Sequence, residues 1–183
     1  SANLARSLSL MDKKTLLIGA DLRNPQISRT INIQKRESGF SSYLAGHVKD
    51  YHQIIERVAP FFFVMQSGSI PPNPNEMLSR PGVKEMFDKL KEEFDYIVVD
   101  SAPVGVVSDT FLLASYANAT LYVVRENYSK RDTIHFINNL VADGRLKNVG
   151  VVLNYTTYNS ASAGYKYKYR YKYGYKYGYG NDN

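Results

Sequence analysis

The chain has 183 residues, enough for one compact domain before a distinct C-terminal segment, and it carries a formal net charge of +6. It contains no cysteine, which excludes disulfide bonds and thiolate metal sites. Residues 164–183 hold five Lys or Arg and one Asp, so the rest of the chain is close to neutral and we expect no nucleic-acid-binding surface on it.

The predicted elements alternate between strands and helices. Helices are predicted where apolar residues recur at helical spacing, and strands where short apolar runs are continuous. In chain order we expect a helix over 2–10, a strand over 15–18, short helices over 40–45 and 51–58, a strand over 61–65, a helix over 83–94, strands over 96–99 and 120–124, a helix over 130–141 and a strand over 149–153. This order indicates an α/β fold, a parallel sheet flanked by helices on both faces.

Polar side chains lie at the carboxyl ends of three of the predicted strands. They are Asp21, Asp100 and Asn154. In parallel sheets ligands bind beyond the carboxyl ends of the strands, so these residues are candidates for one site. A single aspartate at such a place is more simply explained as a cap on the following turn. Two aspartates, each followed by a turn with proline, favour a site for Mg²⁺ or a nucleotide.

The C-terminal segment has a tyrosine at every second position. Between them stand lysine, arginine or glycine, so neither face of the segment is aliphatic, and we expect residues 160–183 to form a flexible tail after a folded domain over 1–159. Clustered phenols in a flexible tail suit repeated phosphorylation. A disordered basic tail or a binder of RNA or another anionic polymer would fit the same pattern. The eight tyrosines are Tyr165, Tyr167, Tyr169, Tyr171, Tyr173, Tyr175, Tyr177 and Tyr179.

Several segments together resemble the bacterial tyrosine kinases. Residues 16–23 (LLIGADLR) resemble their Walker A′ motif, a hydrophobic run followed by D-x-D-x-R, and residues 97–103 (IVVDSAP) resemble their Walker B motif, a hydrophobic run followed by D-x-x-P. Residues 68–78 (GSIPPNPNEML) are similar to a loop-helix segment of the family, whose hallmark is a C-terminal tyrosine cluster. The two Walker motifs are shared with the cell-division and chromosome-partitioning ATPases, whereas the loop and the tail are typical of the kinases.

The resemblance implies a deviant P-loop NTPase fold and a kinase that transfers phosphate from Mg-ATP to tyrosines of its own tail, in trans. In family terms Asp21 and Asp100 are catalytic and hold Mg²⁺ with its waters, and Arg23 belongs to the nucleotide-binding signature. Asn154 would contact the adenine by analogy with related ATPases, although it equally fits a polar strand end that caps a turn. The cofactors implied are ATP and Mg²⁺.

The resemblance also implies partners and a location. Relatives assemble as rings in which the tail of one subunit enters the site of its neighbour. They are fused to, or activated by, a membrane chain-length regulator and are opposed by a tyrosine phosphatase. They control capsule or exopolysaccharide synthesis and export from the cytoplasmic face of the bacterial inner membrane. Nucleic acid is not among the partners expected.

Two departures from the family pattern bear on activity. Gly19 stands where D-x-D has its first aspartate, so no role of that carboxylate transfers to this chain. No G-x-x-x-x-G-K-[ST] sequence occurs, so we expect the P-loop and the strand before it to be missing, and residues 1–183 to be an inactive part of a longer kinase. An ATPase switch of the MinD or ParA type is the second hypothesis, since it explains the aspartates but not the tyrosines. A polymer-binding module is the third.

Overall fold

The computed structural model describes residues 1–105 and 108–156, so the tyrosine cluster and the proposed tail over 160–183 lie outside the described residues. The strands are β1 (Thr15–Gly19), β2 (Ile55–Ala59), β3 (Phe62–Met65), β4 (Tyr96–Asp100), β5 (Thr120–Arg125) and β6 (Val149–Asn154). The helices are α1 (Ala2–Ser9), α2 (Ile27–Thr30), α3 (Phe40–Leu44), the 3₁₀ helix η1 (Tyr51–Ile54), α4 (Pro74–Leu78), α5 (Pro81–Glu93), α6 (Asp109–Ala114) and α7 (Asp132–Ala142).

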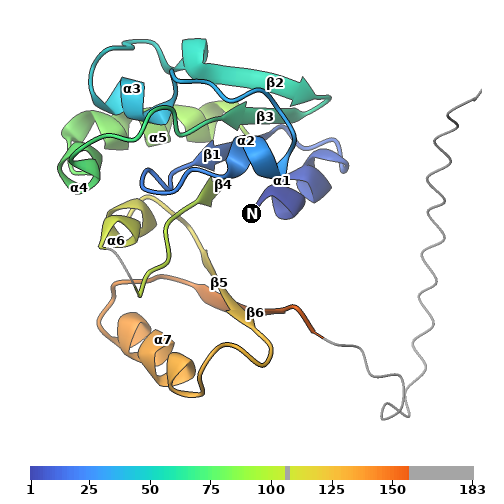
Figure 1. The fold of residues 1–183 in the computed structure, drawn as a ribbon, viewed down its shortest axis with the longest axis vertical. Coiled ribbons are helices and arrows are strands. Elements are labelled where there is room, and N and C mark those ends of the chain that lie inside the picture. The colour runs from blue at the N-terminus through green and yellow to red at the C-terminus, as the bar shows by residue number, and fades with distance from the viewer. Residues whose placement is uncertain (106–107, 157–183) are drawn as a thin grey trace, which may run out of the picture.

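Four strands form the main sheet in the order β2-β3-β1-β4, and β5 pairs with β6 in a separate sheet (Figure 1). The pairs β1–β3, β1–β4 and β5–β6 are parallel, as the continuous apolar runs predict. The α/β class with parallel strands is therefore confirmed. In the part of the chain that the structure describes, β4 and β5 do not pair with each other, so the strands expected in one sheet are divided between two.

The central strand β1 is buried along its whole length, which its sequence TLLIG permits because only Thr15 carries a polar side chain. Its residues alternate between two cores, as the pleat of a strand requires. Leu16 and Ile18 belong to the core that also contains residues of α3, α4 and α5, whereas Leu17 belongs to the core with α1 and α2. Helices therefore cover both faces of the main sheet, as expected.

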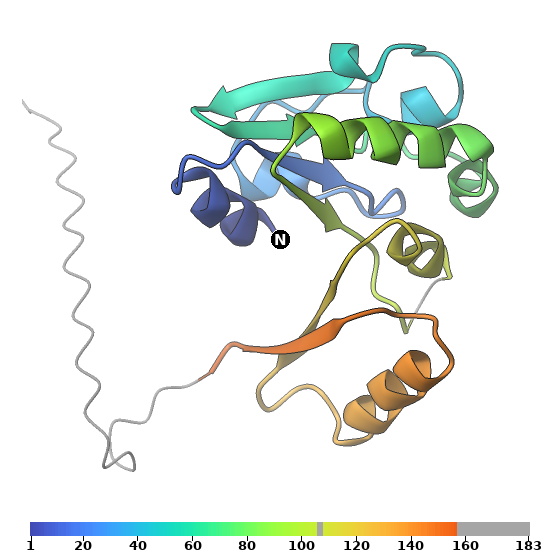
Figure 2. The ribbon, with the colours of Figure 1, turned by 180° about the vertical axis from the view of Figure 1, so that it is seen from behind.

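The helix α5 lies across one face of the main sheet (Figure 2). Its buried residues Val83, Met86, Phe87 and Leu90 have the spacing that predicted this helix, so that prediction is confirmed. The helix begins with Pro81, whose missing N–H is not needed in the first turn. On the opposite face α1 contributes only small buried residues, Ala2 and Ala5, to the core around Leu17.

The helix predicted over 51–58 is wrong. Only Tyr51–Ile54 is helical, as the single turn η1, and Ile55–Ala59 form the edge strand β2, which pairs antiparallel with β3. The β-branched Ile55 and Val58 favour a strand, and a short turn needs no more than the cap that Asp50 supplies by accepting the N–H of His52.

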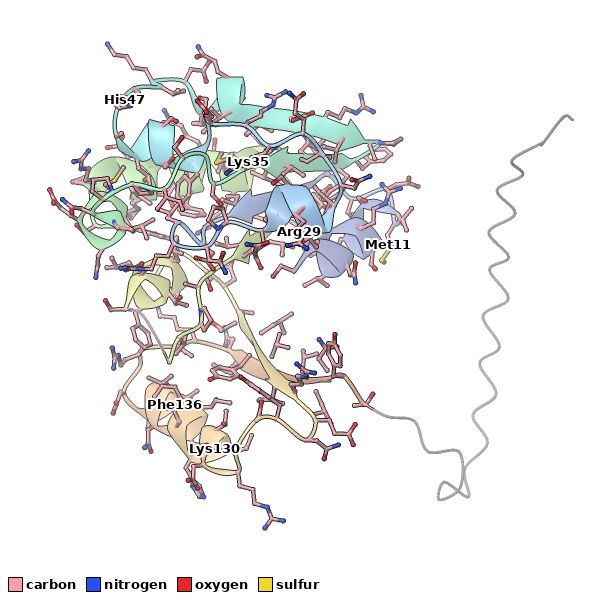
Figure 3. The ribbon with its side chains drawn as sticks, viewed as in Figure 1. Met11, Arg29, Lys35, His47, Lys130 and Phe136 are labelled. Atoms are coloured by element: carbon pink, nitrogen blue, oxygen red, sulfur yellow. The ribbon has the colours of Figure 1, made fainter. Side chains whose placement is uncertain are left out.

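The second sheet is covered less completely than the first. Leu140 of α7, Ala114 of α6 and Leu146 form a small core beside it. Other aliphatic side chains of this sheet stay exposed, namely Leu121, Val123, Val151, Val152 and Leu153. Elsewhere on the surface, Met11 after α1 and Phe136 on α7 are also exposed (Figure 3). Among the described residues no helix is both long and apolar enough to cross a membrane.

Candidate functional site

The candidate site lies where β1 and β4 end side by side. These strands are parallel with Gly19 opposite Asp100, and the N–H of Ala20 donates to the carbonyl of Asp100 at 2.8 Å. Asp21 follows two residues after Gly19, so the two predicted aspartates lie at the same end of the main sheet, where the carboxyl ends of β1 and β4 meet. Both are partly exposed. The structure thus places the two aspartates that the sequence singled out at the same end of the main sheet.

Asp21 also shapes the loop that follows β1. Its Oδ1 accepts the backbone N–H groups of Arg23 at 3.1 Å and of Asn24 at 2.9 Å, an arrangement typical of aspartate at the start of a turn. The capping role and the ligand role are therefore compatible. Within the described residues the second oxygen, Oδ2, makes no hydrogen bond.

Arg23 is held by a residue that the sequence analysis missed. Its Nε donates to Oδ2 of Asp109 at 2.8 Å and its Nη2 to Oδ1 at 3.3 Å, a two-pronged pair in which the Asp109 side chain is only 5% exposed and the Arg23 side chain 47%. This hydrogen bonding, and then the charge of Asp109, raises the pKa of Arg23. A buried carboxylate needs such a partner. Arg23 therefore anchors the loop after β1 to the start of α6. Its role in binding a nucleotide stays a prediction.

Asp109 had a signal in the sequence. The run Ser108-Asp109-Thr110 precedes the apolar residues 111–114, and such a run is typical of a helix start. That signal predicts α6, but not that its first residue binds Arg23, 86 positions away.

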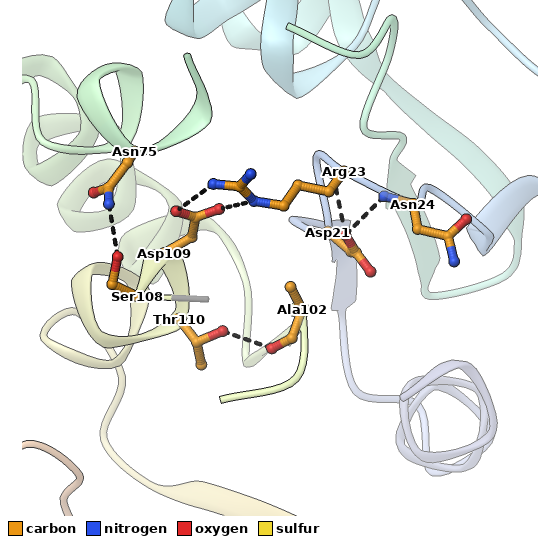
Figure 4. A network of polar contacts seen from close by, with 8 residues as sticks. All are labelled: Asp21, Arg23, Asn24, Asn75, Ala102, Ser108, Asp109 and Thr110. Atoms are coloured by element: carbon orange, nitrogen blue, oxygen red, sulfur yellow. Dashed lines mark hydrogen bonds and ion pairs between the residues drawn. The ribbon is translucent and has the colours of Figure 1, made fainter. Parts of the chain in front are cut away.

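The chain neighbours of Asp109, Ser108 and Thr110, make two further hydrogen bonds (Figure 4). Asn75 of α4 donates through Nδ2 to Oγ of Ser108 at 2.7 Å. The Thr110 hydroxyl donates to the carbonyl of Ala102, just after β4, at 2.6 Å. The network therefore joins the loop after β1, the loop after β4, α4 and α6. Three segments that the sequence singled out separately, 16–23, 68–78 and 97–103, thus meet at one end of the main sheet.

Gly19 has no room for a side chain in this structure. A Cβ atom there would lie 2.7 Å from Oγ of Ser67 and 3.1 Å from its backbone nitrogen. Ser67 follows β3 and is 3% exposed, and its hydroxyl is buried without a hydrogen-bond partner among the described residues. The space beside the end of β1 is thus occupied by Ser67, so a side chain at position 19 would require Ser67 to move.

Asn154 is placed differently from the two aspartates. It ends β6, is exposed, and pairs in register with Arg125 of β5. In both overall views the end of β6 lies away from the edge where β1 and β4 end (Figures 1 and 2). The structure therefore does not bring Asn154 to the candidate site, and its role in binding adenine stays a prediction.

The donor set limits the kind of metal the site suits. No cluster of three or more His, Cys, Asp or Glu that could hold a metal occurs among the described residues. Mg²⁺ in phosphoryl-transfer sites is bound by one or two carboxylates together with waters and substrate phosphates. Asp21 and Asp100 fit a magnesium ion that arrives with a nucleotide, and they do not fit a metal held by protein ligands alone.

Comparison with known proteins identifies the family. No family model matches the chain. The chain is 32% identical over 164 residues to the tyrosine-protein kinase CpsD of Streptococcus agalactiae. The aligned region covers 90% of this chain and 72% of that protein. It is 34% identical over 155 residues to CpsD of Streptococcus pneumoniae, covering 84% and 68%. The chain belongs to the bacterial tyrosine kinases.

Solved structures of this kinase family agree. The kinase domain of the Escherichia coli tyrosine kinase ETK matches with a TM-score of 0.78 and 27% identity, over 91% of this chain and 64% of that one. The VpsO kinase domain matches with a TM-score of 0.77 and 30% identity, over 86% and 77%. MinD of Pyrococcus horikoshii shares the fold, with a TM-score of 0.67, but is only 18% identical. The bacterial tyrosine kinases are therefore favoured over the MinD-type hypothesis.

Proposed function

We propose that this kinase transfers the γ-phosphoryl group of Mg-ATP to tyrosines 165–179 of another copy of itself, within a system that makes capsule or exopolysaccharide. One observation carries the proposal. Asp21 and Asp100 lie at the neighbouring carboxyl ends of β1 and β4, in a chain that belongs to the tyrosine kinases. The eight tyrosines supply acceptors in the same chain.

In this proposal each residue of the site has a defined task. Phosphoryl transfer depends mainly on positioning and charge neutralisation, and a bound Mg²⁺ would neutralise the phosphate oxygens. Asp21 and Asp100 would bind that ion and its waters, and Arg23, fixed by Asp109, would keep the loop after β1 in place. The phenol oxygen of the acceptor forms the new bond to the γ-phosphorus while the bond to the ADP oxygen breaks. The phenol proton leaves to a nearby carboxylate or to water.

Charge supports a tail from one copy reaching the site of another. The tail segment 164–180 carries five cations and no anions, whereas the site presents two carboxylates and, in the proposal, the phosphates of ATP. Each phosphate added to the tail brings about −1.5 to −2 charges. Three of them would cancel the five cations, so phosphorylation would weaken the association of subunits. A ring-like homo-oligomer, a membrane chain-length regulator and a tyrosine phosphatase are the partners that we propose, at the cytoplasmic face of the membrane.

A mixing experiment tests the transfer between copies. The two variants are made in the intact protein, which here means the kinase in its full natural length. One variant carries phenylalanine at all eight tail tyrosines and keeps Asp100, and the other carries Asp100→Asn and keeps its tyrosines. We expect phosphotyrosine within 165–179 of the Asp100→Asn variant only after the two are mixed with Mg-ATP. Phosphorylation of Asp100→Asn by itself would contradict the role of Asp100. Absence of phosphate in the mixture, when the unmodified protein phosphorylates its own tail, would contradict transfer in trans.

A further inference from the structure

Two exposed tyrosines of the described region lie against one arginine. The guanidinium carbon of Arg125 is 4.1 Å from the ring centre of Tyr155 and 5.4 Å from that of Tyr128, within the range of cation–π contacts. Tyr128 is 78% exposed and Tyr155 is 67% exposed. Both phenols are therefore open to solvent while their rings are held beside a positive charge.

The ends of two neighbouring strands build this arrangement. Arg125 ends β5 opposite Asn154 of β6, so Tyr155 follows directly beside it. After β5 the chain turns back: the N–H of Ser129 donates to the Arg125 carbonyl, and the N–H of Arg125 donates to the Ser129 hydroxyl, both at 2.9 Å. This turn places Tyr128 on the same arginine.

Other tyrosines of the described region lack this combination. The Tyr51 ring is 7% exposed and its hydroxyl donates to Glu93, and Tyr116 stacks on Phe87 with ring centres 5.1 Å apart. Tyr96, the first residue of β4, is 46% exposed. Among the described residues, however, no cation lies over its ring. Exposure together with an adjacent guanidinium distinguishes Tyr128 and Tyr155.

We propose that Tyr128 and Tyr155 are additional acceptors for the phosphoryl group that this kinase transfers, and that Arg125 binds the phosphate once it is attached. The proposal rests on the proposed function for its phosphoryl donor, Mg-ATP. The phenol oxygen bonds to the γ-phosphorus, the bond to the ADP oxygen breaks, and the phenol proton passes to water. Arginine binds phosphate through paired, charge-assisted hydrogen bonds. The new phosphate carries about −1.5 to −2 charges, so Arg125 exchanges its contact with the neutral ring for a stronger ion pair at the same place.

Site mapping tests the first half of the proposal. The intact protein, and a variant with phenylalanine at the eight tail tyrosines, are incubated with Mg-ATP, and phosphate is located by tandem mass spectrometry. We expect phosphate on Tyr128 and Tyr155 in both proteins and none on Tyr96. Phosphate in 165–179 but not on Tyr128 or Tyr155 would overturn this inference and leave the proposed function standing. Phosphate on Tyr96 to the same extent would also overturn it, because exposure alone would then explain the pattern. No phosphotyrosine anywhere would overturn both.

The role of Arg125 is tested by the rate at which phosphate is removed. The phosphorylated protein, an Arg125→Met variant and an Arg131→Met control are treated with a purified tyrosine phosphatase. Arg131 is a matched control because it is exposed on the loop that leads into α7 and contacts no tyrosine ring in the described region. We expect Tyr155 to lose its phosphate several times faster in Arg125→Met than in the other two proteins. Equal rates in all three would overturn the assignment of Arg125.

Discussion

Replacing Gly19 by alanine should destabilise the protein, because the added Cβ would lie 2.7 Å from the Ser67 hydroxyl and 3.1 Å from the Ser67 nitrogen. Contacts this short force the surrounding atoms to move, and inserting one carbon into a packed interior typically costs about 1–3 kcal/mol. For a domain of this size 1 kcal/mol corresponds to about 2–4 °C in Tm. The Gly19→Ala variant should therefore melt about 2–12 °C below the unmodified protein.

A second substitution at Ser67 makes this prediction specific. Ser67→Ala removes the nearest atom and also a hydroxyl that is buried without a partner, so by itself it should be neutral or stabilising. In the double variant the shortest remaining contacts are those to the Ser67 nitrogen at 3.1 Å and to Cγ1 of Ile27 at 3.3 Å. Small shifts of a few tenths of an ångström relieve these contacts. We expect a coupling free energy of about 1–2 kcal/mol, in the direction of rescue.

Urea unfolding of the four proteins, followed by circular dichroism, measures this coupling. The reasoning is refuted if Gly19→Ala is as stable as the unmodified protein. It is equally refuted if the effects of the two substitutions simply add, because Ser67 would then not be the group that excludes a side chain at position 19.

Two further predictions concern charged groups. The ring nitrogens of His52 donate hydrogen bonds to the carboxylates of Asp50 and Glu93, and these bonds raise the pKa of His52 above 6.5. The stabilisation from His52 is therefore complete below about pH 6.5 and is lost as the pH rises through the raised value of the folded state. His52→Gln should remove this loss of stability above about pH 6.5, as measured by urea unfolding at a series of pH values. An unchanged profile would show that groups other than His52 cause the pH dependence. Asp109→Asn should raise the KM for Mg-ATP in the intact protein roughly tenfold, because an amide cannot pair with Arg23 as a carboxylate does. An unchanged KM would show that anchoring Arg23 does not matter for nucleotide binding.

The sequence predicted most of the main sheet because its signals are local. Continuous apolar runs such as 15–18 and 96–99 indicate strands, and the spacing from Val83 to Phe94 indicates an amphipathic helix. The run 51–58 was misread because its apolar residues, Tyr51, Ile54, Ile55 and Val58, recur at helical spacing over a length too short to decide. Antiparallel pairing with β3, a contact made in the folded chain, decides in favour of a strand there.

The candidate site was predictable in part for the same reason. Aspartates after buried strands follow from the strands themselves, so Asp21 and Asp100 were found. Asp109 was not, because its importance depends on Arg23, which is distant in sequence and becomes a neighbour only through folding. Ser67 was missed likewise, since its effect on Gly19 is a contact between the ends of two paired strands. Asn154 was grouped with the aspartates on the expectation of one sheet, and the described strands form two.

The measurement that tests the central claim most directly is a map of phosphate on the intact protein after incubation with Mg-ATP, beside a folded Asp100→Asn variant. The account predicts phosphotyrosine within 165–179 of the unmodified protein and none in Asp100→Asn, with the same circular dichroism spectrum for both. Hydrolysis of ATP without phosphate on the protein, or equal phosphorylation of the two proteins, would contradict it.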